Sequence, residues 1–175
     1  MNESELTKEQ LVEILDKYLL NLAYGDIEKT LSLAGTNLAV FILGACFIDA
    51  MAGFRFGITK KDIKKGGVSS RHFQDFTKEY LPAYSAKDLW KSLRCGLVHT
   101  YTEYGKYAFV NNKSYAHHEP TPKGKTIVDN ESFYIELGKA YQKLKDDILT
   151  KDEVFNNAKR RLALGIMKID LINKS

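Results

Sequence analysis

The chain consists of stretches with helical periodicity separated by short polar breaks, and the clearest stretch covers residues 7–22. Apolar side chains recur there with the spacing of one helix face, at Leu11, Ile14, Leu15, Tyr18, Leu19 and Leu22. Thr7 and Gln10 have the spacing of a capping box, so the helix begins near residue 8. Gly25-Asp26 interrupts the pattern and predicts the end of this helix, followed by a short second helix to about residue 34.

A long apolar segment comes next. Residues 38–54 contain a single charged side chain, Asp49. A helix that is apolar on all sides is typical of the centre of a bundle. A segment of this length is at the lower limit for crossing a bilayer, and a carboxylate in its middle is costly in lipid. The pattern therefore favours a buried central helix over a membrane span.

The second half of the chain predicts more helices and one change of period. A helix runs from Ser85 to about Glu103 with an inward stripe of Trp90, Leu93, Leu97, Tyr101 and Tyr104. Residues 107–111, 114–118 and 126–129 then have the character of short strands, and helices at about 132–149 and 152–172 close the chain. We therefore expect a single all-α domain over residues 1–175. It would be a bundle of about five to six helices with a small β-hairpin insertion at about 105–130.

Composition agrees with a globular protein. Of 175 residues, 44% are apolar and 27% are charged, and the net charge of +4 is too small to identify a polyanionic partner by itself. Two cysteines, Cys46 and Cys95, are too few for a disulfide framework, and both are expected to be small buried hydrophobic residues. The polar N-terminus, MNESELTKEQ, has no apolar signal region, so we expect a cytoplasmic protein.

Candidate chemistry lies in the predicted helix after Ser85. The segment Leu93-Arg94-Cys95-Gly96-Leu97-Val98-His99-Thr100 contains an R-x-x-x-x-H element. Such an element on a bundle helix, in a helical chain of this length, resembles the HEPN superfamily. The resemblance implies a helical-bundle homodimer and, for many members, a metal-independent ribonuclease. It places Arg94 and His99 at the two functional positions and suggests a polar partner from a neighbouring helix, for which Asp49 is the candidate.

The resemblance covers the bundle and leaves the β-insertion outside. The chain also departs from the family, because Cys95 stands where the ribonucleases commonly have asparagine or histidine after the arginine. In a regular α-helix, residues five apart are separated by about 140° around the axis and by roughly 7.5 Å along it. Arg94 and His99 would then be unable to meet on one straight helix, so we expect a two-fold symmetry mate to unite them in a shared cleft.

The expected chemistry needs few groups. RNA carries its own nucleophile, the 2′-hydroxyl. Histidine, with a reference pKa of about 6.5, suits proton transfer at neutral pH. Arginine stays charged and stabilises a developing phosphorane. No metal and no other cofactor is required, and His117-His118-Glu119 is expected to be a hairpin end because adjacent strand residues point to opposite faces.

A basic segment at residues 57–71 is the candidate RNA-binding element. It contains a single acidic residue, Asp62, and five basic ones: Lys60, Lys61, Lys64, Lys65 and Arg71. Two interpretations stay open for it, a solvated surface loop and a patch that attracts phosphate.

Two functions are compatible with these patterns. The first is an endoribonuclease, similar to a toxin or a phage-defence effector. The alternative is a non-catalytic helical dimer module that binds a nucleotide, an RNA or a protein partner, with Tyr107, Phe109 and Tyr115 of the hairpin in its surface. In that alternative His99 is an ordinary surface or interface histidine, and Arg94 pairs with Glu103 or Asp88.

Overall fold

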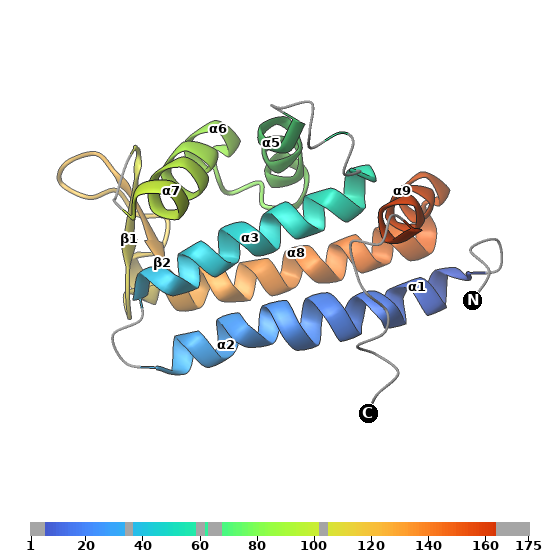
Figure 1. Cartoon of the computed structure of the whole chain (residues 1–175). Helices are drawn as coiled ribbons and strands as arrows, with labels where there is room; N and C mark the ends of the chain where they lie inside the picture. The colour runs from blue at the N-terminus through green and yellow to red at the C-terminus, as the bar shows by residue number, and fades with distance from the viewer. Residues whose placement is uncertain (1–5, 34–36, 59–61, 63–67, 102–104, 164–175) are drawn as a thin grey trace.

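The computed structural model describes residues 6–33, 37–58, 62, 68–101 and 105–163. Helix α3 (Asn37–Phe56) lies at its centre, as Figure 1 shows. Helices α5 (Val68–Tyr80), α8 (Asn130–Thr150) and α9 (Asp152–Ala163) pack against α3. The described residues form six long helical segments with a small β-insertion, so the predicted all-α bundle is confirmed.

Burial of α3 explains this arrangement. A helix that is apolar on every side needs partners on every side, and each large side chain it buries contributes about 1.5–3 kcal/mol. Residues 38–56 are long and apolar enough to span a membrane by length and composition, and 56% of that window is buried inside the molecule. In this fold the segment is the core helix of the bundle, with the following buried side chains: Val40, Phe41, Ala45, Phe47, Ile48, Met51, Ala52 and Phe54.

The first helical segment is longer than predicted. It combines α1 (Lys8–Leu15), a π-helix η2 (Asp16–Tyr24) and α2 (Gly25–Ser32), and the predicted capping box at Thr7 is present. The predicted break at Gly25-Asp26 is wrong, because Gly25 has a helical φ of −62°. The wider π winding also rotates later residues relative to earlier ones. Leu22 consequently lies 56% exposed, whereas Leu11, Leu15 and Leu19 are fully buried.

A second composite helix follows α5 and the turn at residues 81–85. It contains α6 (Ala86–Leu89), the π-helix η3 (Trp90–Leu97) and α7 (Val98–Thr100). The predicted start at Ser85 is confirmed. The helix ends at Tyr101, which has a left-handed φ of 53° and is 63% exposed, so it does not belong to the inward stripe. Leu93 and Leu97 are fully buried, as predicted, and Tyr104 lies outside the described residues.

The insertion (residues 105–129) is a parallel strand pair and not a hairpin. Strands β1 (Tyr107–Val110) and β2 (Thr126–Asp129) pair in register, with Tyr107 opposite Thr126. The predicted middle strand is wrong, because Ser114–Ala116 forms a short 3₁₀ turn, η4. The chain between β1 and β2 therefore crosses back before it pairs, as a parallel connection requires. Strand β2 leads directly into α8, whose first turn is capped by Asp129 through the Ser132 N–H.

Helix α8 makes polar contacts with several of its neighbours. The hydroxyl of Tyr80 in α5 donates to Asp147 at 2.6 Å, and the hydroxyl of Tyr141 in α8 donates to Asp16 of η2 at 2.8 Å. Burial, followed by the hydrogen bond to the carboxylate, raises the pKa of both phenols, so both stay protonated donors at neutral pH. The hydroxyl of Tyr24 binds the Tyr134 carbonyl oxygen at 3.0 Å.

Substitution of two glycines tests how closely α3 and α8 approach. A Cβ at Gly44 would lie 2.5 Å from Phe133 Cε1 and 3.1 Å from Leu137 Cδ1, both on α8. Gly44→Ala is therefore expected to lower the free energy of unfolding by about 1–3 kcal/mol through overpacking. Gly25→Ala is the matched control, because its nearest neighbour is 3.7 Å away, and it should raise that free energy by about 0.5–1 kcal/mol. Urea unfolding midpoints measure both, and equal effects would contradict the close approach.

Candidate functional site

Three polar side chains meet where α3 packs against the composite helix α6-η3-α7. Arg94 Nε donates to Asp49 Oδ2 at 2.7 Å, and Arg94 Nη1 lies 3.2 Å from His99 Nε2. The Asp49 and Arg94 side chains are each 25% exposed, and His99 is exposed. The structure thus brings together the three residues that the sequence analysis predicted. Asp49 lies on the core helix, Arg94 contacts both other residues, and His99 is the exposed one.

The winding of η3 explains how Arg94 and His99 meet. In a π-helix the backbone hydrogen bond spans five residues instead of four, so residues i and i+5 lie about one turn apart on the same side. Arg94 belongs to η3 (Trp90–Leu97), and His99 follows in α7. The expected 140° separation is therefore wrong, because it assumed a regular α-helix. A symmetry mate is not needed to bring the two side chains into contact.

The contacts also select one tautomer of His99. An arginine side chain has donors and no acceptor, so the His99 nitrogen that faces Arg94 must be an acceptor. For the neutral imidazole this places the proton on Nδ1 and leaves a lone pair on Nε2. Nε2 is thus an acceptor on an exposed side chain, and a permanent positive charge lies 3.2 Å away. This combination suits proton transfer beside a developing negative charge.

Asp49 fixes the position of the guanidinium. Burial raises the pKa of Asp49 above its usual value, and the hydrogen bond and charge of Arg94 act in the opposite direction. Because Arg94 uses Nε for this contact, its remaining N–H groups stay available on the side of His99. The alternative pairing of Arg94 with Asp88 is wrong, since Asp88 contacts Ser85 and Lys106, and Glu103 lies outside the described residues.

The cysteines near this site differ from expectation. Cys46, one turn before Asp49 on α3, is exposed, and Cys95 is half-buried. Cys46 was expected to be buried because α3 is apolar, but it lies on the side that carries Asp49. Partial desolvation of the thiol raises its pKa above the usual value.

The candidate RNA-binding residues fall mostly outside the described part of the chain. Lys60, Lys61, Lys64 and Lys65 all lie among residues that the structure does not describe. Arg71 lies on α5, where its side chain is 83% exposed and its Nε is 3.5 Å from Asp75. Of the aromatic residues proposed for a binding surface, Tyr107 and Phe109 are buried in the core and Tyr115 is 79% exposed.

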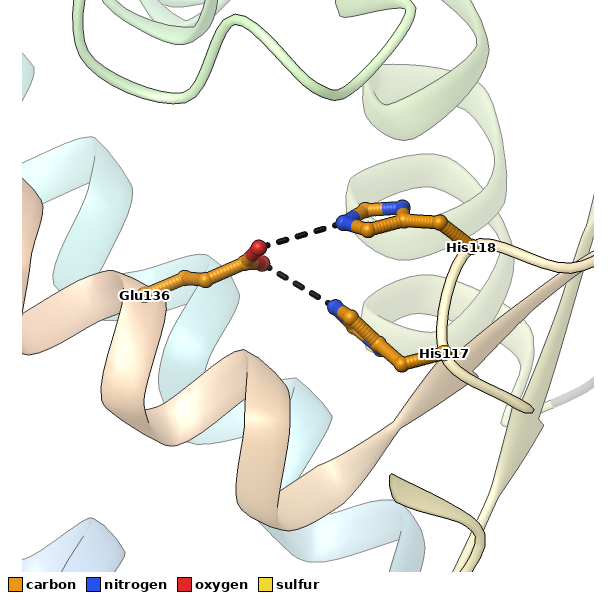
Figure 2. Close-up of side chains that lie close together, drawn as sticks. All are labelled: His117, His118 and Glu136. Carbon is orange, nitrogen blue, oxygen red and sulfur yellow. Dashed lines mark hydrogen bonds and ion pairs between the residues drawn. The ribbon is translucent and has the colours of Figure 1, made fainter. Parts of the chain in front are cut away.

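A second polar cluster was missed by the sequence analysis. Nε2 of His117 lies 3.2 Å from Glu136 Oε2, and Nε2 of His118 lies 3.1 Å from Glu136 Oε1, as Figure 2 shows. The hydroxyl of Tyr84 donates to the same carboxylate. The histidines were assigned to a strand that would point them apart, but they follow a 3₁₀ turn, and His118 has a left-handed φ of 67°. Nothing in the sequence pairs them with Glu136, which lies in the next helix.

Comparisons with known proteins add no relative. No family model, no curated protein and no solved structure matches the chain. What the structure itself shows is a helical bundle with a partly exposed arginine–histidine pair, in which an aspartate of the core helix binds the arginine.

The tautomer of His99 offers a test that does not depend on any activity. We expect long-range ¹H–¹⁵N NMR correlations, recorded above the pH at which the imidazole charges, to show Nε2 as the unprotonated nitrogen. Arg94→Gln should abolish this preference for the Nδ1–H tautomer, because the positive charge of the guanidinium donor is lost. Lys91→Gln, a change at an exposed position of the same helix, should preserve it. A proton on Nε2 in the wild-type protein would contradict the Arg94–His99 contact.

Proposed function

We propose that the chain is a cytoplasmic, metal-independent endoribonuclease of the HEPN type. The observation that carries the proposal is the convergence of Asp49, Arg94 and His99 within hydrogen-bonding distance on one face. The R-x-x-x-x-H element and the resemblance to the HEPN superfamily point to the same three residues. A toxin-like or phage-defence role is part of the proposal through the resemblance.

Each residue has a defined part in the proposed reaction. When RNA binds, the phosphate takes over the Arg94 N–H that contacts His99 Nε2 in the free protein, which frees the Nε2 lone pair. Nε2 then accepts the proton of an RNA 2′-hydroxyl, and the freed oxygen attacks the adjacent phosphorus. Arg94 donates hydrogen bonds to the non-bridging oxygens as negative charge builds on the phosphorane. The bond from phosphorus to the 5′-oxygen breaks, and the proton held by His99 passes to that oxygen. The products are a 2′,3′-cyclic phosphate and a 5′-hydroxyl.

Asp49 has a positioning role in this scheme. It touches neither the nucleophile nor the phosphate, and it holds the guanidinium at 2.7 Å so that the free N–H groups face His99. The ion pair is partly exposed, so its contribution to stability is small, about 1 kcal/mol or less. Its effect on the reaction would come from the geometry that it maintains.

A homodimer remains part of the proposal through the resemblance alone. The pair Arg94 and His99 is complete within one chain, so catalytic geometry no longer supplies a reason for two copies. Light scattering of the purified protein measures the oligomeric state directly and independently of any cleavage assay.

Cleavage of a mixed-sequence RNA in the presence of a chelator tests the proposal. His99→Ala is expected to reduce the rate by about 100- to 10,000-fold through loss of the proton acceptor. Arg94→Ala should reduce the rate by about 100- to 1,000-fold through loss of charge stabilisation. The wild-type products should carry cyclic phosphate ends, which end-specific enzymatic treatment and mass spectrometry identify.

Lys91→Ala is the control for this experiment. Lys91 is an exposed basic residue on η3, so this variant removes a positive charge from the same helix without touching the proposed site. Its rate should stay within about twofold of the wild type. Equal rates in all variants would overturn the proposal. RNA binding without turnover in the wild type would instead support the non-catalytic alternative.

A further inference from the structure

The cluster around Glu136 joins three parts of the chain that are distant in sequence. Glu136 lies on α8, Tyr84 in the turn before α6, and His117 and His118 in the insertion. The Glu136 side chain is 25% exposed and that of His117 is 9% exposed. Tyr84 is nearly buried. The turn that carries Tyr84 leads directly into the helix of Arg94 and His99.

The hydrogen bonds of His117 determine which nitrogen carries its proton. The backbone N–H of Asp129 donates to His117 Nδ1 at 3.0 Å. Because a neutral imidazole has one acceptor and one donor, Nε2 must carry the proton and donate it to Glu136. The insertion is fastened at the same place by Asp129, whose Oδ1 accepts from the Lys113 N–H at 2.7 Å.

A divalent metal ion is the obvious alternative explanation for this cluster. The ligand atoms of His117, His118 and Glu136 all lie within 4.8 Å of one another, and two imidazoles with a carboxylate suit zinc. A zinc-bound histidine, however, donates its second N–H to an acceptor. His117 has the opposite arrangement, since its second nitrogen already receives a hydrogen bond from Asp129. This arrangement of donors therefore favours a cluster held together by hydrogen bonds over a metal site.

The charges around Glu136 agree with an ionised acceptor. Burial raises the pKa of Glu136, the hydrogen bonds from Tyr84, His118 and His117 act in the opposite direction, and its pKa lies below the usual value. Burial and then the charge of Glu136 raise the pKa of Tyr84, which stays a protonated donor. Lys139, also on α8, lines the same cavity as Tyr84 and Glu136. Tyr107 and Asp129 are the other titratable groups that act on Tyr84.

We propose that Glu136 is a carboxylate latch, closed by the donors of Tyr84, His117 and His118, that docks the insertion and the residue 81–85 turn onto α8. An ionised carboxylate can accept all three bonds, whereas a protonated one would bring a fourth donor to the cluster. The latch is independent of the proposed ribonuclease activity. Its structural effect is to hold the start of the helix that carries Arg94 and His99.

Hydrogen exchange measured by mass spectrometry at neutral pH tests the latch. Glu136→Gln introduces an amide N–H₂ that faces donors, so exchange in peptides from residues 105–129 and 81–85 should accelerate by about tenfold or more. Peptides from α1 should be unchanged. Glu131→Gln on the exposed first turn of α8 is the matched control, and it should behave as the wild type. Unchanged exchange in Glu136→Gln would overturn the proposal.

The pH dependence has a defined sign. A carboxyl group whose pKa is lowered by folding stabilises the native state above its unfolded-state pKa and loses this effect as pH falls through its folded-state pKa. The difference in urea midpoint between wild type and Glu136→Gln should therefore shrink as the pH falls from about 5 toward 3. A difference that stays constant down to about pH 3 would contradict an ionised latch.

A zinc titration separates the two explanations and begins with the wild-type protein. Equimolar zinc, followed by calorimetry and by exchange of the insertion, should have no effect, and long-range NMR correlations should show His117 protonated on Nε2. Stoichiometric zinc binding that slows exchange, and that is lost in His118→Ala, would replace the latch with a metal site.

Discussion

Helix α3 is apolar around its whole circumference, and the need to cover it from every direction determines where the other helices lie. Helices α5, α8, α9 and the composite helix of η3 all pack against it. The coverage is partial, since 56% of the window 38–56 is buried. Asp49 and Arg55 are the charged side chains of α3, and Asp49 remains at the edge of the packed surface because Arg94 compensates its charge. The candidate site thus occupies a place where coverage of the core helix is incomplete, and the charge there is held by a partner of opposite sign.

Polar contacts between helices follow a different geometry from apolar ones. Helix α8 exchanges tyrosine–carboxylate hydrogen bonds with α5, with η2 and with the turn before α6. Each such bond satisfies a buried hydroxyl and fixes the rotation of one helix relative to another, which apolar contact alone specifies less sharply. Apolar burial around α3 therefore stabilises the fold, and the hydrogen bonds of α8 fix how the neighbouring helices are rotated.

Much of this fold follows from hydrophobic periodicity, and two of the failures share one physical cause. The capping box at Thr7 and the start at Ser85 are local signals, and Leu93 and Leu97 are close enough in the chain to share a face in either winding, so the sequence predicted them. The position of Leu22 and the Arg94–His99 distance were predicted wrongly because Leu22 lies in η2 and Arg94 in η3, and a period of 3.6 residues does not describe π winding. A π segment is stabilised by tertiary packing that the local sequence does not report.

Contacts between distant segments were the other limit. The sequence located β1 and β2, but their parallel pairing depends on how the intervening residues cross. Glu136 gave no signal, since nothing in its helix distinguishes a carboxylate that binds two histidines of the insertion from one that faces water. The candidate site was accessible to sequence reasoning because two of its three residues belong to one helix, whereas the Glu136 cluster draws on three separate segments.

The wide winding of η3 has a consequence for how such sites are compared between proteins. In an α-helix the side chains that can touch are three or four residues apart, whereas here contact occurs across five. The number of residues between an arginine and a histidine that touch therefore depends on whether the helix between them has α or π winding. An equivalent pair on a regular α-helix would need an interval of three or four residues.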